Sequence, residues 1–310
     1  MIYSIRHKTT YSYERAVTFA RCVLRLRPES TSAQTLLGST VTLTPEPSEL
    51  IERRGAFGEQ TLTVVIDKPH RTLVVEARSK VDVHRPAIVA PLDSPAWEDV
   101  RAASFDTHLM GPQSPADYLF PTARTKLVPM ITDYGRPSFA PGRPIIDAAA
   151  ELMTRIHADF TYDSDATTVS TPTAEAFEAK HGVCQDFAHV MITALRGIGL
   201  PAAYVSGYLR TNPPPGRPRL EGADATHAWV TVWCGEQRGW IGLDPTNAIF
   251  VENDHIVLAV GRDYSDVAPI DGIMLAPGEQ ALKVAVDVIP ENELGVVRPD
   301  FGAKAAIAAR

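Results

Sequence analysis

One cysteine of the sequence, Cys184, lies where a thiol can gain chemical reactivity. It stands three residues before Phe187, from which apolar residues recur every three to four positions as far as Ile198, a spacing that predicts one face of a helix. At a helix start, unpaired backbone N–H groups and the positive end of the helix dipole favour the thiolate. The same N–H groups can stabilise an oxyanion on a substrate carbonyl. The alternative interpretation is a small buried apolar side chain, the usual role of a free cysteine.

A histidine and an aspartate follow at positions from which they can act on such a thiol. His227 begins a predicted strand over 227–234, and Asp244 ends the next predicted strand over 240–244. Side chains alternate between the two faces of a strand, and directly opposed residues share a face. Whether the two side chains meet therefore depends on how the two strands pair.

The pairing has two outcomes. If Trp233 pairs with Trp240, His227 and Asp244 lie on one face and stand diagonally to each other, within reach of long side chains. A shift by one residue puts them on opposite faces, and Asn247 then becomes the alternative partner of the histidine.

A cysteine, a histidine and an aspartate have a clear division of labour. The imidazole accepts the thiol proton and later protonates the leaving amine, while the carboxylate fixes the tautomer and orientation of the ring. With helix-start N–H groups as oxyanion donors, these side chains predict attack on an amide carbonyl and an acyl-thioester intermediate.

Four further residues are candidates for the cleft, each with an ordinary structural alternative. Gln185 could donate to an oxyanion or be a solvated polar residue at a helix start. Tyr162 and Tyr208 could line the cleft or pack in the core. Trp229 shares a face with His227, where it could form a dry wall beside the histidine or simply pack in the core.

Four stretches of the sequence together resemble the bacterial transglutaminase-like family. They are Gly182-Val183-Cys184-Gln185-Asp186-Phe187-Ala188-His189, Tyr204-Val205-Ser206-Gly207-Tyr208, Ala225-Thr226-His227-Ala228-Trp229-Val230 and Trp240-Ile241-Gly242-Leu243-Asp244-Pro245-Thr246-Asn247. The match in order, spacing and flanking residues covers roughly 145–265, and the N-terminal strands resemble the β-rich module that precedes this domain in the family.

The resemblance implies both a fold and roles for individual residues. It implies a papain-like core, in which a helix with the nucleophile packs on an antiparallel sheet with the histidine and the acid. Cys184 then matches the family nucleophile, His227 its base and Asp244 its orienting acid. Family members are described as thiol proteases or amidases, and relatives with the same three residues cross-link glutamine to amines.

The order of predicted elements gives an α+β fold class for the domain from residue 144 onward, because helices come first and strands follow there. The predicted segments are an all-β sandwich-like module over 1–90, a Pro-rich linker over 91–143, a catalytic domain over 144–290 and a tail over 291–310. Strands are predicted at 1–13, 21–27, 39–44, 60–66, 72–83, 202–209, 256–260 and 282–288. The polar, Pro-rich loop over 211–225 is a surface connection or a lid.

Composition excludes several other classes. The 310 residues include 30 basic and 37 acidic side chains, for a net charge of −7, and no basic stripe, so nucleic acid is not an expected partner. No apolar stretch is long enough to span a membrane, and the first residues lack the apolar core of a signal peptide, so we expect a cytoplasmic protein that does not bind membranes. The three cysteines show no zinc-site spacing and there is no EF-hand loop, so neither metal nor cofactor is expected.

The sequence therefore predicts cleavage of an amide or isopeptide bond in a peptide or small amide. Hydrolysis is favoured over amine transfer, because nothing in the sequence identifies an acceptor site for an amine. The alternatives are a glutamine–amine transglutaminase, a non-enzymatic scaffold that holds a peptide in the same cleft, or an enzyme that works with partner enzymes in a peptide-modifying pathway. The oligomeric state has no signature in the sequence.

Overall fold

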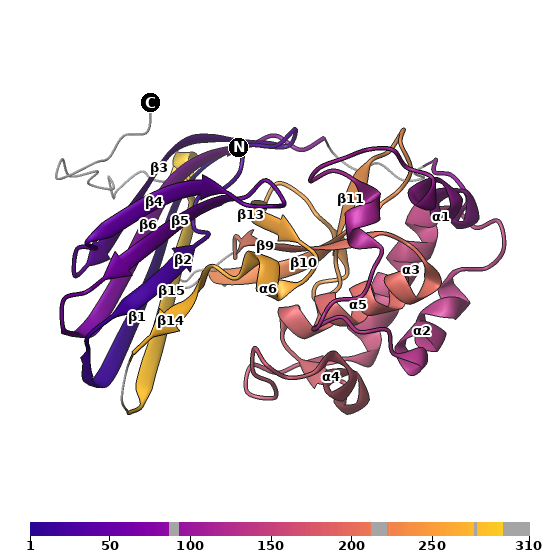
Figure 1. Cartoon of the computed structure of the whole chain (residues 1–310). Coiled ribbons are helices and arrows are strands. Elements are labelled where there is room, and N and C mark those ends of the chain that lie inside the picture. Colours follow the sequence, from indigo (N-terminus) through magenta and orange to yellow (C-terminus); the bar gives the residue numbers. More distant parts are fainter. Residues whose placement is uncertain (87–92, 212–221, 223, 276–277, 294–310) are drawn as a thin grey trace.

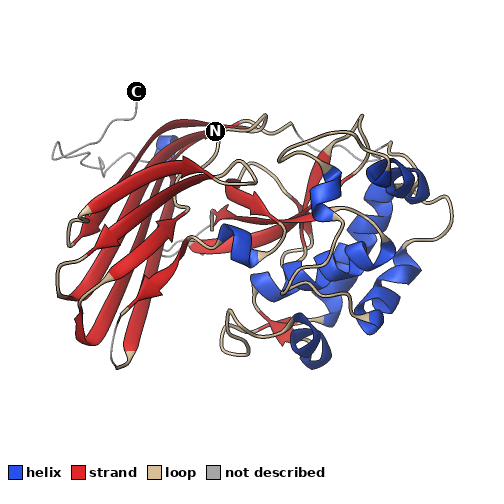
Figure 2. Cartoon of the chain, viewed as in Figure 1, coloured by secondary structure: helices blue, strands red, loops and turns tan. Residues whose placement is uncertain are grey.

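The computed structural model describes residues 1–86, 93–211, 222, 224–275 and 278–293. The chain forms a lobe built of strands, here called the β-sandwich, and an α+β lobe that contains the long helices (Figures 1 and 2). Most of the loop over 211–225 and of the tail over 291–310 lies outside the described residues, so the lid prediction is not addressed.

The β-sandwich consists of two four-stranded sheets with the strand orders β15-β1-β6-β3 and β14-β2-β5-β4. Its strands are β1 (Ile2–Val17), β2 (Ala20–Leu24), β3 (Gln34–Thr44), β4 (Glu49–Arg54), β5 (Gln60–Ile66), β6 (His70–Val83), β14 (Ile270–Met274) and β15 (Gln280–Pro290). Every second residue of β1 and β6 is buried over most of their length, as expected for strands with one face on a core. Residues such as Cys22, Val64 and Leu73 fill the space between the sheets.

The expected division of the chain into segments is wrong for the last two strands of the β-sandwich. The predicted catalytic segment 144–290 includes β14 and β15, yet these strands pair with β2 and β1 of the N-terminal module. Tyr3 pairs with Pro290 and Tyr13 with Gln280, so β15 is the continuation of the N-terminal sheet. The first strand and the last two strands of the described residues thus lie in the same module.

The α+β lobe contains a five-stranded antiparallel sheet with the order β12-β11-β10-β9-β13. Its strands are β9 (Ala202–Leu209), β10 (Ala225–Trp233), β11 (Trp240–Asp244), β12 (Ile249–Phe250) and β13 (His255–Gly261), with a separate short pair β7 (Thr161–Tyr162) and β8 (His181–Gly182). The helices are α1 (Trp97–Phe105), α2 (Pro129–Gly135), α3 (Ile145–Asp159), α4 (Thr173–Ala179), α5 (Cys184–Ile198) and α6 (Tyr264–Val267). Short 3₁₀ turns lie at Pro115–Tyr118, Arg136–Ser138 and Glu291–Glu293.

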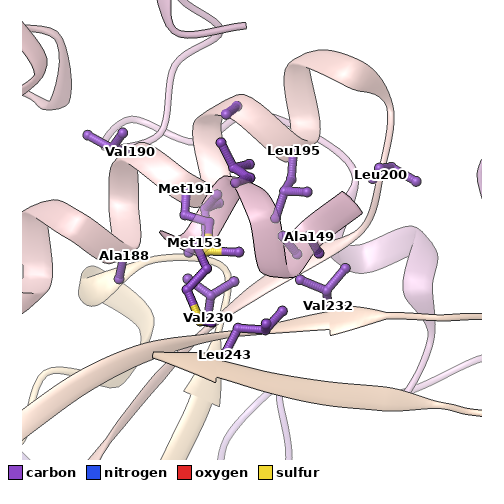
Figure 3. Close-up of a cluster of buried hydrophobic side chains, with 14 of the residues drawn as sticks. Ala149, Met153, Ala188, Val190, Met191, Leu195, Leu200, Val230, Val232 and Leu243 are labelled. Carbon is purple, nitrogen blue, oxygen red and sulfur yellow. The ribbon is translucent and has the colours of Figure 1, made fainter. Parts of the chain in front are cut away.

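Helix α5 is the centre of this lobe and is buried on almost all sides. Met191 and Leu195 of α5, together with Met153 of α3, lie over Val230 of β10 and Leu243 of β11 (Figure 3). A helix that is buried on almost every side lies in the middle of a core. Its position is therefore fixed from every direction, which suits a helix that has to hold a reactive group.

Polar anchors fix both ends of α5. The Val183 N–H donates to the Asp186 carboxylate (2.9 Å), which satisfies one orphan donor at the helix start. At the other end, the buried Arg196 guanidinium donates to the hydroxyl of Thr125 (2.8 Å) and to three backbone carbonyls. The helix ends at Gly199, whose φ of 91° is easily adopted only by glycine.

The Pro-rich segment predicted as a linker forms part of the helical layer. Helix α2 packs against α5, with Ile131 fully buried in the shared core. Within the described residues no helix is long and apolar enough to cross a lipid bilayer.

The two lobes share a core of their own. Tyr3, Val81 and Val286 of the β-sandwich pack with Tyr208 of β9 and Ile256 of β13. The sheet of the α+β lobe is therefore supported by helices on one side and by the β-sandwich at β9 and β13.

Candidate active site

Cys184 is the first residue of α5 and is only partly buried. The Asp186 and Phe187 N–H groups bond to the Val183 carbonyl, whereas the N–H groups of Cys184 and Gln185 have no acceptor among the described residues. The other two cysteines are buried, and burial raises the pKa of each thiol, that of Cys234 to about 12. Of the three, Cys184 alone combines access with a helix start.

The β10–β11 register brings His227 and Asp244 together. Trp233 pairs with Trp240 and Val230 with Leu243, so the register that puts the two side chains on one face is confirmed. The His227 Nε2–H donates to Asp244 Oδ2 at 2.8 Å. The other ring nitrogen is thereby left free for Cys184, which lies near enough to His227 to raise the pKa of the ring.

These contacts set the charge of the histidine. Burial alone lowers the pKa of His227, but the hydrogen bond to Asp244 and the nearby Cys184 act in the opposite direction and raise it to about 10. The protonated imidazole is therefore the form of His227 that these contacts favour.

Asp244 is completely buried and accepts five hydrogen bonds. Oδ1 accepts the backbone N–H groups of Thr246 and Asn247, at 3.0 and 3.2 Å. Oδ2 accepts from His227, from the Asn247 side chain at 2.7 Å and from His255 at 3.2 Å. Burial would raise the pKa of this carboxyl, but hydrogen bonds from His227, His255 and Asn247 outweigh it and hold the pKa well below its usual range.

His255 is the residue of this group that the sequence analysis missed. His255 is the first residue of β13, and His227 lies near the start of β10; each is followed by a run of apolar residues. The position of His255 just before a predicted strand is the feature of the sequence that could have identified it. Its ring packs edge-on against Trp229, with 5.2 Å between centroids.

The structure separates the remaining candidates. Trp229 and Asn247 lie at the site: the indole is 6.1 Å from the His227 ring and fully buried, and Asn247 bonds to Asp244 rather than replacing it. Tyr208 is not brought to the site, because residues 207 and 208 of β9 point to opposite faces and Gly207 is the one paired with His227. Its hydroxyl instead bonds to a histidine of the β-sandwich, at 3.0 Å.

Gln185 and Tyr162 both lie near Cys184. The Gln185 amide donates to the Val169 carbonyl (3.2 Å), so it anchors the segment after β7. Tyr162 pairs with Gly182 and is 57% exposed, and its pKa is raised by burial and by the nearby Cys184. Both therefore flank Cys184, the glutamine as an anchor and the tyrosine as an exposed aromatic surface.

Only one group of His, Cys, Asp and Glu side chains in the described part of the chain is compact enough to hold a metal ion. It consists of His227, Asp244 and His255, whose ligand atoms lie within 4.8 Å of one another. The Asp244 oxygen in this group already accepts hydrogen bonds from both rings, which accounts for the close approach of the three side chains.

Comparison with known proteins agrees with this fold. Residues 3–82 match the bacterial transglutaminase-like N-terminal region, and residues 134–245 match the transglutaminase-like superfamily. An uncharacterized protein of Mycobacterium tuberculosis is 39% identical over 295 residues, covering 93% of this chain and 92% of the relative. An uncharacterized protein of Mycobacterium leprae is 29% identical, covering 91% and 96%. The chain belongs to the bacterial transglutaminase-like family.

Two further similarities concern named proteins. A protein-glutamine gamma-glutamyltransferase of Pseudomonas aeruginosa is 31% identical over 131 residues, which cover 36% of this chain and 19% of that protein. A Cytophaga hutchinsonii structure described as a "putative cysteine protease" matches with a TM-score of 0.67 at 20% identity, covering 94% of this chain and 91% of that one. The expected fold class, a transglutaminase-like core preceded by a β-rich module, is confirmed.

Proposed function

We propose that this protein is a thiol-dependent enzyme that cleaves an amide or isopeptide bond in a peptide-like substrate through an acyl-thioester on Cys184. One observation carries the proposal: His227 is hydrogen-bonded through Nε2 to the buried Asp244 and lies near Cys184 at the start of α5. This order of groups matches the division of labour between nucleophile, base and orienting acid.

The reaction follows from the charges at the site. The Cys184 thiolate attacks the carbonyl carbon, and the free N–H groups at the start of α5 stabilise the oxyanion. As the C–N bond breaks, the His227 imidazolium donates its proton to the leaving nitrogen, so an amine departs and the thioester remains. Water then attacks the thioester and gives its proton to His227, which releases a carboxylic acid and restores the thiolate.

The surroundings of the thiol support a peptide-like substrate. Exposed apolar side chains flank the site, namely Tyr162, Val169 on the segment held by Gln185, and Ile249, which pairs with Asp244. Exposed apolar groups beside reactive polar ones suit a ligand that has both a polar backbone and apolar side chains.

The proposal is tested by the rate at which iodoacetamide alkylates Cys184. At pH 6 we expect alkylation at least tenfold faster than for a free cysteine peptide, and a His227→Ala variant should lose this advantage, because the imidazolium no longer stabilises the thiolate. Intact mass spectrometry with a Cys184→Ser control distinguishes Cys184 from the two buried thiols. Ordinary reactivity of Cys184 in the wild-type protein would refute the enzyme and favour a scaffold that binds peptides.

The acyl group is identified by trapping. After incubation with a mixture of peptides and small amides and rapid acid quench, the mass added to Cys184 gives the acyl group. A Cys184→Ser variant, which cannot form a thioester, is the matched control.

Amine transfer is a second candidate function, favoured by the similarity to the Pseudomonas aeruginosa gamma-glutamyltransferase. In that reaction a primary amine replaces water in the second step, so an amide forms and, with a glutamine substrate, ammonia is released. Adding cadaverine in excess to the reaction before the acid quench separates the two functions. A product with the mass of the amide indicates transfer, and the free acid indicates hydrolysis.

A further inference from the structure

We propose that His255 is a positioning residue for the site, and that the β-sandwich fixes Asp244 by holding His255. The inference rests on the proposed function, since Asp244 acts on the thiol through His227. It assigns a role to a fourth side chain and to the N-terminal module.

The hydrogen bonds of His255 define its protonation. The backbone N–H of Glu252 donates to His255 Nδ1 at 3.3 Å, so this nitrogen is an acceptor and carries no proton. The ring proton is then on Nε2, which lies 3.2 Å from Asp244 Oδ2. His255 is thereby placed as a donor to the carboxylate through Nε2.

This donor completes the set of contacts around Oδ2. The oxygen accepts from His227, from Asn247 and from His255, which approach from three different elements or turns. With the two backbone donors to Oδ1, they leave the carboxylate a single orientation. The His255 ring is in turn held by Trp229, which packs against it and lies beside His227.

The segment that contains His255 is held by hydrogen bonds from residues of the β-sandwich and of the segment after β6. Arg85, which follows β6, donates to the carbonyls of Glu252 and His255 at 2.6 and 2.7 Å. Gln34 of β3, fully buried, makes two hydrogen bonds of 2.8 Å with the backbone of Val257, one in each direction. Tyr3 of β1 donates to the side chain of Asp254 at 2.6 Å.

These contacts lie at a local irregularity of the sheet. His255, Ile256 and Val257 pair with residues 209 to 207 of β9, and the register shifts directly after them, between Val257 and Ala259. β13 is the edge strand of its sheet, and the Gln34 amide bonds to the backbone of Val257 at this point. The β-sandwich therefore helps to hold His255 from the outer edge of β13, and His255 helps to hold Asp244.

The test compares alkylation of Cys184 in two variants of the full-length protein over pH 5–9. In His255→Leu we expect the rate at pH 6 to fall about tenfold and the acid limb of the profile to move to higher pH, because Asp244 loses a donor that stabilises its ionised form. His255→Gln can place an amide N–H near the position of Nε2 and an oxygen near the Glu252 N–H, so it should restore the rate to within about threefold. A Leu variant with the wild-type rate and profile, or a Gln variant as slow as the Leu variant, would overturn the inference.

The contribution of the β-sandwich is tested in the same assay. Arg85→Met should lower the rate about threefold to fivefold, while Arg71→Met, at an exposed position of β6, should leave it unchanged. Equal rates in both variants would overturn the role of the β-sandwich. Far-ultraviolet circular dichroism and thermal melting confirm that each variant is folded.

Nuclear magnetic resonance of ¹⁵N-histidine-labelled wild-type protein gives an independent result that needs no variant. At pH 7 the His255 ring should be neutral with its proton on Nε2, and a proton on Nδ1 would refute the arrangement. This outcome is separate from failure of the proposed function, which would show as ordinary reactivity of Cys184 in the wild-type protein.

Discussion

Replacing Asp244 with asparagine tests the electrostatic reasoning most directly, because the change keeps the shape of the side chain and removes its charge. The pKa of His227 is raised from 6.5 to about 10, a difference that corresponds to about 5 kcal/mol in favour of the imidazolium. If Asp244 supplies about half of this, the equilibrium between the imidazolium–thiolate pair and the neutral pair shifts about 50-fold toward the neutral pair in the variant.

The variant also loses hydrogen bonds whichever way its amide is oriented. An NH₂ group in place of Oδ1 faces the backbone N–H groups of Thr246 and Asn247, and in place of Oδ2 it faces the fixed donors of His255 and Asn247. Each buried donor left without an acceptor costs about 1–3 kcal/mol, so we expect Asp244→Asn to lower the free energy of unfolding by about 2–5 kcal/mol.

The assay is the rate of Cys184 alkylation between pH 5 and 9, measured by intact mass, with urea denaturation for stability. We expect Asp244→Asn to lower the rate at pH 6 by about 10- to 50-fold. Asp287→Asn, at a buried carboxylate of β15 that lies near Arg6, is the control and should keep the wild-type rate. Equal rates and pH profiles in wild type and Asp244→Asn would refute the idea that the carboxylate stabilises the imidazolium.

Three further predictions concern packing and pH. Gly207→Ala should lower the free energy of unfolding, measured by urea denaturation, by about 1–3 kcal/mol. A Cβ at position 207 would lie 2.2 Å from a backbone carbonyl of β13 and 2.4 Å from the Trp229 ring. Gly38→Ala is the control and should change stability little, because a Cβ there would meet no atom within 4 Å. Arg196→Met should lower the free energy of unfolding by about 2–5 kcal/mol, since four buried acceptors lose their donor; unchanged melting would contradict this. The pKa of Asp244 is held below its usual range, so its ionised form stabilises the fold above about pH 4, and this contribution is lost as pH falls. The free energy of unfolding of Asp244→Asn should therefore decrease less between pH 7 and acidic pH than that of the wild-type protein.

The parts of the fold that the sequence predicts well are those with a strong local pattern. The predicted strands 202–209, 240–244 and 60–66 have the bounds of β9, β11 and β5, and α5 begins at Cys184, since each has an uninterrupted apolar pattern with a clear stop. The sequence left two pairings of β10 and β11 open, and the structure has the one in which Trp233 pairs with Trp240.

Elements that depend on distant partners were harder to predict. Every residue of β4 is exposed, so its sequence has no alternation of apolar and polar residues that would predict a strand. β15 was predicted as a strand, but its pairing with β1, more than 250 residues earlier, leaves no local signal and it was assigned to the wrong module. His255 was missed for a related reason, since its role depends on backbone contacts supplied by the β-sandwich.

Tyr208 shows that a match between short sequence segments does not establish that each residue in them lies at the site. The segment around it matches the family, but strand alternation turns Tyr208 away from His227 and toward the β-sandwich. Gly207, its neighbour, is the residue that faces the site, and the absence of a side chain there leaves room for the ring of Trp229.

The return of β14 and β15 to the N-terminal sheets has a consequence for how the protein is made. During synthesis β1 and β2 leave the ribosome without one neighbour each, and these edges stay unpaired until nearly the whole chain has emerged. The contacts of the α+β lobe are closer in sequence, so this lobe can fold first. The pairing of β14 with β2 and of β15 with β1 then follows as a late step. A product shortened before residue 270 would retain Cys184, His227 and Asp244 but expose two bare sheet edges, and we expect it to aggregate rather than to work as a smaller enzyme.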